Sequence, residues 1–293
     1  MSDNPVRHDA DVQAHVARLF VYPVKSCAGV ALDEAVLTPS GLDLDRAWMV
    51  VDARGEFVSQ RELPRMALIR PQLRTFEIVL RAPGMLALHL SIEGVEAPVR
   101  VQVWDDEVSA YDMGDVAAQW FSDFLGRPLR LVRFDPDHQR LSSFRWTRGV
   151  EASNQFSDGF PLLVSSEAAL ADLNARLASA GHPPVGMERF RPNLVLGGVG
   201  PFEEDHLNEL RITTAQGLVR LRLVKPCARC PIPDSDPATG VASPEVGDTL
   251  RGFRRDARLD GAVTFGMNAI VLEGDGHALR VGQPVLADLA FEG

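Results

Sequence analysis

The stretch LVKPCARCPIPD, residues 223–234, gathers the residue types of this chain that are most able to do chemistry. It holds Cys227 and Cys230, two of the three cysteines, with Arg229 between them. Nearby positive charge favours the thiolate form of a cysteine, and a thiolate is a nucleophile and a soft ligand for transition metals. The stretch therefore predicts an ionised thiol at the end of a strand, followed by an acidic, turn-rich loop, 233–240, that covers a site.

Three other roles for these cysteines compete with this one. A structural zinc site needs four ligands, but the chain has neither a second C-x2-C pair nor two histidines at H-x3–5-H spacing, so distant ligands would be required. A thioredoxin-type dithiol opens a helix, whereas Pro231 and Pro233 hold the following backbone extended. The third alternative is that both cysteines are simply small buried residues at the end of a strand, which is the usual role of a cysteine. The pairing of Cys227 with Cys230 and the adjoining charges argue against that role.

Only two of the 30 basic residues are lysines, and both stand two positions before a cysteine. Lys25 lies in YPVKSC and Lys225 lies in LVKPC, each after an apolar, strand-like run. An ammonium group is a compact point charge that suits a phosphate or a buried acceptor which a planar guanidinium cannot reach. An arginine-rich composition explains the other basic residues, but it does not explain why both lysines have the same sequence context. We therefore expect each lysine to have a specific role, such as binding a phosphate or a buried acceptor.

The composition sets the class of protein. A chain of 293 residues with 45% hydrophobic and 24% charged residues is typical of a soluble globular protein with one large domain or two ordinary ones. The formal net charge of −10 excludes broad binding to nucleic acid or an anionic membrane, but allows one small positive pocket. Residues 1–13 lack the apolar core of a signal peptide, and no run suits a membrane span. With only three cysteines, no disulfide framework is expected, which indicates a reducing cytoplasm.

The elements that must position the candidate residues are mostly strands. Short segments of period-two hydrophobicity follow one another from residue 16 to about residue 104, which indicates a barrel or a sandwich. More strands follow in the second half, after a polar, poorly periodic segment, 135–153, that we interpret as a loop or linker. Three helices are predicted, over residues 115–126, 167–181 and from Ser243 to about 255. The pattern predicts a β-rich protein in two parts.

Six segments, in order along nearly the whole chain, resemble one known family. They are YPVKSCAGVALDEAVLTPSGLDLDRAWMVVD (22–52), SQRELPRM (59–66), FSDGFPLLVSSEAALADLNARL (156–177), RFRPNLVLGG (189–198), KPCARCPIPDSDPATG (225–240) and FGMNAIVLEG with LRVGQPV (265–285). Through them the chain resembles the MOSC proteins, in particular the group of the mitochondrial amidoxime-reducing component and its bacterial relatives. The resemblance implies an α+β, predominantly β fold: an N-terminal β-barrel domain over 14–134, then a β-barrel-like MOSC domain with a few helices over 150–289.

The resemblance also implies a molybdenum cofactor, a phosphorylated pyranopterin that binds between the two domains. The family's metal ligand matches Cys230, which would hold the metal together with the cofactor's dithiolene, and Cys227 is not assigned as a ligand. The residues that match the family's phosphate and pterin contacts are Lys25, Ser26, Arg46, Arg191 and Asn193. Ser165 and Ser166 are added because they lie where a strand meets a helix N-terminus, a natural anion site. A few placed donors can hold such a polyanion without a broad basic surface.

The implied activity is reduction of N-hydroxylated compounds by oxygen transfer to reduced molybdenum. Asp236 is a candidate proton relay, although aspartate in such a turn often only caps it. Because no cysteine follows Cys230, we expect no iron–sulfur cluster and a separate electron-donor protein, such as a flavin reductase or a ferredoxin. Pro231-Ile232-Pro233 replaces hydroxyl residues of the mitochondrial protein, which leaves the substrate range open. The alternative function is non-catalytic: binding or carrying the cofactor, or a role related to sulfur transfer.

Overall fold

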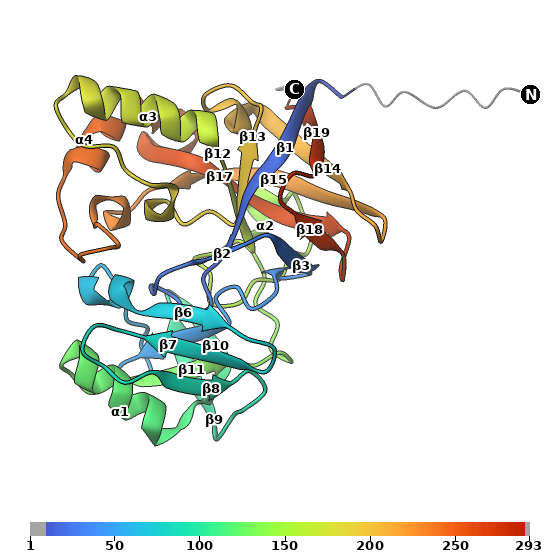
Figure 1. The fold of residues 1–293 in the computed structure, drawn as a ribbon. Helices are drawn as coiled ribbons and strands as arrows, with labels where there is room; N and C mark the ends of the chain where they lie inside the picture. The colour runs from blue at the N-terminus through green and yellow to red at the C-terminus, as the bar shows by residue number, and fades with distance from the viewer. Residues whose placement is uncertain (1–9, 291–293) are drawn as a thin grey trace, which may run out of the picture.

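A closed ring of seven strands forms the upper half of the molecule in Figure 1. In the computed structural model, which describes residues 10–290, the ring follows the order β12-β13-β1-β19-β14-β15-β17, and β12 pairs with β17 to close it. These strands are β12 (Leu162–Ser166), β13 (Leu194–Gly197), β1 (Val12–Val21), β19 (Pro284–Leu289), β14 (Leu207–Thr213), β15 (Leu218–Ala228) and β17 (Ala262–Glu273). An aliphatic cluster that includes Val16, Leu221 and Val285 packs between them. Most of residues 1–13, which bear on a signal peptide, lie outside the described residues.

The first strand of the chain belongs to this barrel. β1 pairs antiparallel with β13 on one side and with β19 on the other, so its side chains join the core of the second half. A short strand, β2 (Val30–Leu32), returns to pair with β1. A three-stranded sheet of β3 (Glu34–Thr38), β4 (Gly41–Leu42) and β18 (Ala278–Arg280) lies beside it. The connection from β1 to β2, residues 22–29, therefore lies between the two halves.

The lower half contains two small sheets and one helix (Figure 1). One sheet has the order β5 (Trp48–Val51), β11 (Arg130–Phe134), β10 (Asp106–Asp112) and β9 (Pro98–Val103), and the other has β6 (Arg70–Leu73), β7 (Glu77–Arg81) and β8 (Leu88–Ser91). Trp48, Ile78 and Leu80 join the apolar face of α1 (Gly114–Leu125) in a single core. The described pairings keep the two sheets separate, so this half is held together by packing as well as by strand ladders.

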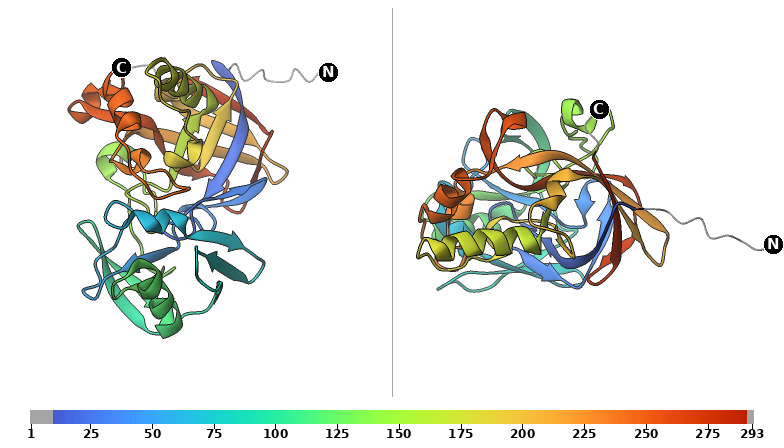
Figure 2. Two further views of the ribbon diagram at one scale, coloured as in Figure 1. Left: turned by 60° about the vertical axis from the view of Figure 1, so that its left-hand side comes forward. Right: turned by 90° about the horizontal axis from the view of Figure 1, so that it is seen from above.

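The predominantly β class with a barrel in the second half is confirmed, and so are three predicted helices. α1 begins one residue earlier than expected. Its C-cap is Gly126, whose φ of 77° lies in the left-handed region that glycine adopts readily. α3 (Glu167–Ser179) covers one side of the barrel (Figure 2), and α4 (Glu245–Arg251) is shorter than predicted. A further single-turn helix, α2 (Phe144–Thr147), lies in the segment predicted as a loop. None of the helices in residues 10–290 has the length and apolarity needed to cross a bilayer.

A buried carboxyl group holds the start of α3. The Ser166 hydroxyl caps the helix by accepting from the Ala169 amide, and it donates to Glu204 Oε2 at 2.7 Å. The Ser166 amide donates to Glu204 Oε1 at 3.1 Å. Glu204 is fully buried, and burial raises the pKa of its carboxyl to about 7. The barrel and α3 are therefore joined by a group that prefers to be protonated.

We expect the pH dependence of stability to reveal this group. The folded pKa of Glu204, about 7, lies above the ordinary value of 4.5, so between these values the folded state holds a proton that the unfolded state releases. The carboxyl therefore stabilises the fold fully only below that window, and this stabilisation is lost as pH rises through about 7. The variant Glu204→Gln keeps an acceptor for Ser166 but cannot titrate.

Denaturant unfolding at pH 5 and pH 8 measures the effect. From pH 5 to pH 8 the unfolding free energy of the wild type should fall by on the order of 2–3 kcal/mol more than that of Glu204→Gln, which lacks the titrating carboxyl. Equal pH slopes for the wild type and the variant would show that Glu204 does not titrate in this range.

Candidate functional site

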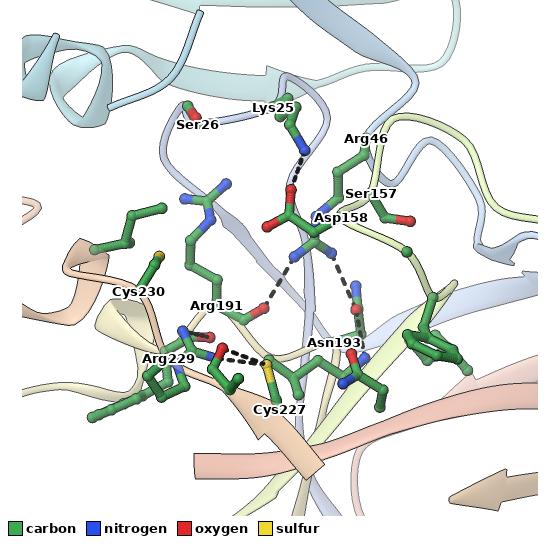
Figure 3. A pocket seen from close by; sticks show the side chains of 18 of the residues that line it. Lys25, Ser26, Arg46, Ser157, Asp158, Arg191, Asn193, Cys227, Arg229 and Cys230 are labelled. Atoms are coloured by element: carbon green, nitrogen blue, oxygen red, sulfur yellow. Dashed lines mark hydrogen bonds and ion pairs between the residues drawn. The ribbon is translucent and has the colours of Figure 1, made fainter. Parts of the chain in front are cut away.

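A cavity of about 120 Å³ lies between the two halves, with walls from both (Figure 3). Lys25, Ser26 and Arg46 come from the segments that follow β1 and β4, and Cys227 and Cys230 come from the end of β15 and the loop after it. The cavity is strongly positive: its cationic lining residues are Lys25, Arg46, Arg61, Arg191 and Arg229, against a single carboxylate, Asp158. In a chain whose net charge is −10, this local excess of positive charge is the feature that most clearly indicates an anionic ligand.

Two arginines share one buried aromatic ring. The guanidinium carbons of Arg46 and Arg191 lie 4.4 and 4.2 Å from the centre of the Tyr22 ring, and Tyr22 is 1% exposed. Gly29 makes room for the ring, because a Cβ there would come 2.5 Å from it. Arg46 donates to the carbonyl of Arg191 at 3.1 Å, and Arg191 donates to the carbonyl of Cys27 at 2.7 Å. Burial, and secondarily the Arg46 charge, lower the pKa of Arg191 to about 10.

The backbone of this site is strained where the charges converge. Ser26, Arg46 and Arg191 have φ angles of 69°, 51° and 59°, in the left-handed region that favours glycine. Each costs on the order of 1 kcal/mol or more, and such residues persist only where their surroundings hold them. Here the amide of Arg46 donates to the carbonyl of Tyr22 at 2.9 Å, and that of Lys25 to the carbonyl of Trp48 at 2.8 Å. The connection after β1 is thus fixed to the lower half.

Lys25 is buried, with 6% of its surface exposed, and already has partners. Its ammonium donates to the carbonyl of Phe156 at 2.7 Å and to Asp158 Oδ1 at 2.5 Å. Burial lowers the pKa of Lys25, while Asp158 acts to raise it. Burial alone would raise the pKa of Asp158, but the charge of Lys25 holds it below its usual range. An incoming phosphate would therefore compete with Asp158 for Lys25.

Asn193 lines the cavity, but its side chain forms its hydrogen bonds with other protein groups. Its Oδ1 accepts from Arg46 at 3.1 Å and from the amide of Leu163 at 3.1 Å, and its Nδ2 donates to the carbonyl of Phe20 at 3.2 Å. The side chain is 1% exposed. Asn193 thus joins β1, the barrel strand β12 and Arg46, so in this structure it positions an arginine that lines the cavity.

Figure 3 shows Cys230 at the left of the cavity and Cys227 at its lower side, beside Arg229. Three register shifts interrupt the pairing of β15 with β17, the third between Pro226 and Ala228, and such irregularities re-aim side chains. Cys227 and Cys230 are free and partly exposed. Arg229 donates to Cys227 Sγ at 3.1 Å and to the carbonyl of Phe190 at 3.0 Å, while its Nε is buried without a partner. Cys27 is fully buried, and burial raises the pKa of its thiol to about 12.

This donor set fits a molybdenum–pterin group better than a zinc ion. Within residues 10–290 no group of three or more His, Cys, Asp and Glu side chains could hold a metal ion, so a four-ligand zinc site has no ligands here. A metal in this cavity would have one or two thiolate ligands from the protein and would take the rest from another molecule. A dithiolene supplies soft sulfur ligands, and a phosphate suits the five cations.

Three of the predicted residues are not at the cavity. Ser165 and Ser166 are both fully buried, and neither lines it. The start of α3 was predicted to bind an anionic ligand. In the structure the carboxyl of Glu204 occupies this place and accepts hydrogen bonds from Ser166. Asp236 accepts from the amide of Ala238 at 2.7 Å, so it caps its own turn and does not line the cavity. The remaining predicted residues do come together around one space: Lys25, Ser26, Arg46, Arg191, Asn193 and Cys230.

The sequence analysis did not single out two charged residues of the lining, Asp158 and Arg61, and named a third, Arg229, only for its charge. Asp158 lies in the quoted segment 156–177, but only its pairing with Lys25 reveals a role. Arg61 lies in the quoted segment 59–66 and reaches the cavity from the lower half. Arg229 was noted as a charge beside the thiols, and the structure adds its direct contact with Cys227. The sequence signal for these residues was that each is a charged residue inside a segment that resembles the family. Many other charged residues lie in the same segments, so this signal does not identify the ones that line the cavity.

Comparison with known proteins assigns family models to two successive parts of the chain, and the first part includes most of β1, which the structure places in the barrel of the second half. Residues 13–128 match the model of the MOSC N-terminal beta barrel domain, and residues 151–286 match that of the MOSC domain. The chain is 36% identical to mitochondrial amidoxime-reducing component 1 of Homo sapiens over 288 residues, 92% of this chain and 82% of that protein. It is 35% identical to mitochondrial amidoxime reducing component 2 of Homo sapiens, with 82% of this chain and 72% of that protein covered. It is also 29% identical to the molybdenum cofactor sulfurase of Bos taurus, over 95% of this chain but only 33% of that protein.

The different burial of the three cysteines predicts their reactivity. In cofactor-free native protein, iodoacetamide should modify Cys227 and Cys230, which are partly exposed, and spare Cys27, which is fully buried with a raised thiol pKa. Mass spectrometry of the digested protein measures each site, and the denatured protein, in which all three sites should react, is the control. Rapid modification of Cys27, or protection of Cys230, in the native protein would contradict the arrangement described.

Proposed function

This chain belongs to the MOSC family, in which it joins the N-terminal beta barrel domain to a MOSC domain, and we propose that it is a molybdenum-dependent reductase of N-hydroxylated compounds. The observation that carries the proposal is the cavity itself. A partly exposed thiol, Cys230, shares one small space with Lys25 and Arg191, which come from segments distant in sequence. A thiolate for the metal and cations for a phosphate are the two things that a molybdenum–pterin cofactor requires of its protein.

The chain's own residues would bind and orient the cofactor. Cys230 would supply the protein's sulfur ligand, and Arg46 and Arg191 would present forked donors to the phosphate. Lys25 and Ser26 would complete this end, with Lys25 exchanging Asp158 for the phosphate. Once bound, the cofactor supplies the two-electron chemistry that breaks the N–O bond. The protein fixes the position of the cofactor and limits the access of water to it.

Electrons would come from a separate protein. Cys227 and Cys230 are the two thiols at the cavity, and within residues 10–290 no cluster of His, Cys, Asp and Glu side chains could hold another metal centre. A flavin reductase, a ferredoxin or a similar small redox protein would fit this need. Asp236 caps its own turn and does not line the cavity, so it is poorly placed to move a proton there.

A second function has one observation in its favour. The likeness to the molybdenum cofactor sulfurase covers 95% of this chain, so the chain could bind the cofactor and hand it on without turnover. The two functions differ in a simple assay. A reductase turns over N-hydroxylated compounds with an artificial electron donor, whereas a carrier restores a cofactor-free molybdoenzyme and does not turn over.

Substitution of the two thiols at the cavity tests the assignment of the ligand. Cys230→Ala should lose bound molybdenum and at least about a hundredfold of its N-hydroxyl reduction, because the metal loses its protein ligand. Cys227→Ala removes the neighbouring thiol, which contacts Arg229, and should retain near-stoichiometric molybdenum. Elemental analysis and reduction of benzamidoxime with a chemical electron donor measure the two effects.

The pair of variants is informative in either direction. Full activity in Cys230→Ala would refute the proposed ligand. Loss of metal from Cys227→Ala alone would transfer the role to the other sulfur. Zinc in place of molybdenum, in protein made by a host that synthesises the cofactor, would reject the proposed function.

A further inference from the structure

Ile232 stands where three cavities meet. It lines the cofactor cavity of about 120 Å³, a second cavity of about 260 Å³ that also contains Arg191, and a third of about 380 Å³. Arg61 lines both the first and the third, so these two adjoin near Ile232. The side chain of Ile232 is partly buried. A molecule that entered through the third cavity toward Cys230 would therefore pass this side chain.

The third cavity, which we call the outer cavity, differs in chemistry from the cofactor cavity. Five cationic side chains line the cofactor cavity, whereas Arg61 is the only cation among the outer cavity's lining residues. Its apolar lining residues are Pro64, Pro231, Ile232, Ala242 and Pro244. Proline-rich walls bury apolar surface without side-chain freedom to lose, because the ring is already fixed. Such a space suits a flat, uncharged organic group better than a phosphate or an ion.

The walls of the outer cavity are held on both sides. The Asp234 carboxylate accepts from the amide of Gly247 in α4 at 2.6 Å, and Arg189 donates to the carbonyl of Pro233 at 3.1 Å. On the other side the loop meets the lower half, where a Cβ at Gly240 would lie 3.3 Å from the carbonyl oxygen of Pro64. Gly240 also has a φ of 72°, which favours glycine. With the backbone held in this way, the side chain at position 232 sets the width of the passage.

We propose that the outer cavity is the subsite for the apolar substituent of an N-hydroxylated substrate, and that Ile232 sets the size of group that reaches Cys230. This inference rests on the proposed function.

Variants at position 232 should change selectivity by substrate size, measured as the ratio of kcat/KM for the largest test compound to that for the smallest. The test compounds are hydroxylamine, benzamidoxime and 4-phenylbenzamidoxime. Ile232→Trp should lower kcat/KM for 4-phenylbenzamidoxime by about tenfold or more, and Ile232→Ala should raise the ratio of kcat/KM for 4-phenylbenzamidoxime to that for hydroxylamine. The control is Val241→Ala, which shortens a β-branched residue on the same loop that is 64% exposed and lines none of the three cavities.

Binding without turnover separates the subsite from the reaction. Calorimetry of cofactor-loaded protein with 4-phenylbenzamidine, the product of the largest test compound, should give about tenfold weaker affinity for Ile232→Trp than for Val241→Ala at equal molybdenum content. Equal selectivity and equal product affinity in all variants would overturn the role of Ile232. If the wild type reduces none of the three compounds, the proposed function fails, and the binding measurement still decides whether the outer cavity holds an apolar group.

Discussion

The structure depends on bringing several positive charges together in one partly closed space. Arg46 and Arg191 share the Tyr22 ring, and Lys25 is buried nearby. Burial removes these groups from water and nearby positive charges repel them, which is why the pKa values of Lys25 and Arg191 are lowered. Backbone carbonyls and two carboxylates, Asp158 beside Lys25 and Asp45 beside Arg46, balance part of this charge, and a positive excess is left. A bound polyanion relieves this repulsion, and we interpret the site as one that is completed by its ligand.

The topology of the chain makes that convergence possible. β1 belongs to the barrel of the second half, so the chain leaves the barrel at Val21, packs against the core of the lower half in residues 22–29 and returns to pair with β1 as β2. The segment that follows β1 therefore lies at the boundary between the halves, and it contains Tyr22, Lys25 and Ser26. β15 returns from the barrel to the same boundary, where its bulges and the prolines after Cys230 turn the thiols inward. The upper half supplies the thiols together with Arg191 and Arg229, and the lower half supplies Arg61, so the complete lining needs both halves.

The sequence predicted the local features well and the distant partners less well. The apolar stripe and Gly126 of α1 are local, as are Ser166 and the leucines of α3, and both helices are found. The pairing of β1 with β13 and β19 joins residues far apart in the chain, which period-two alternation cannot reveal. Lys25, Arg46, Arg191 and Cys230, which the matched motifs indicated, line one cavity in the structure. Ser165 and Ser166 failed as an anion site because Glu204, from a segment with no sequence signal, already occupies the helix start.

Anomalous diffraction at the molybdenum absorption edge tests the central claim most directly. Crystals of the protein purified from a host that makes the cofactor would be measured on both sides of the edge. The account predicts one strong anomalous peak in the cavity between the halves, within bonding distance of Cys230 Sγ, with the phosphate of the cofactor against Arg46 and Arg191. A peak bonded to Cys227 alone, a peak outside this cavity, or a phosphate that contacts neither arginine would contradict it.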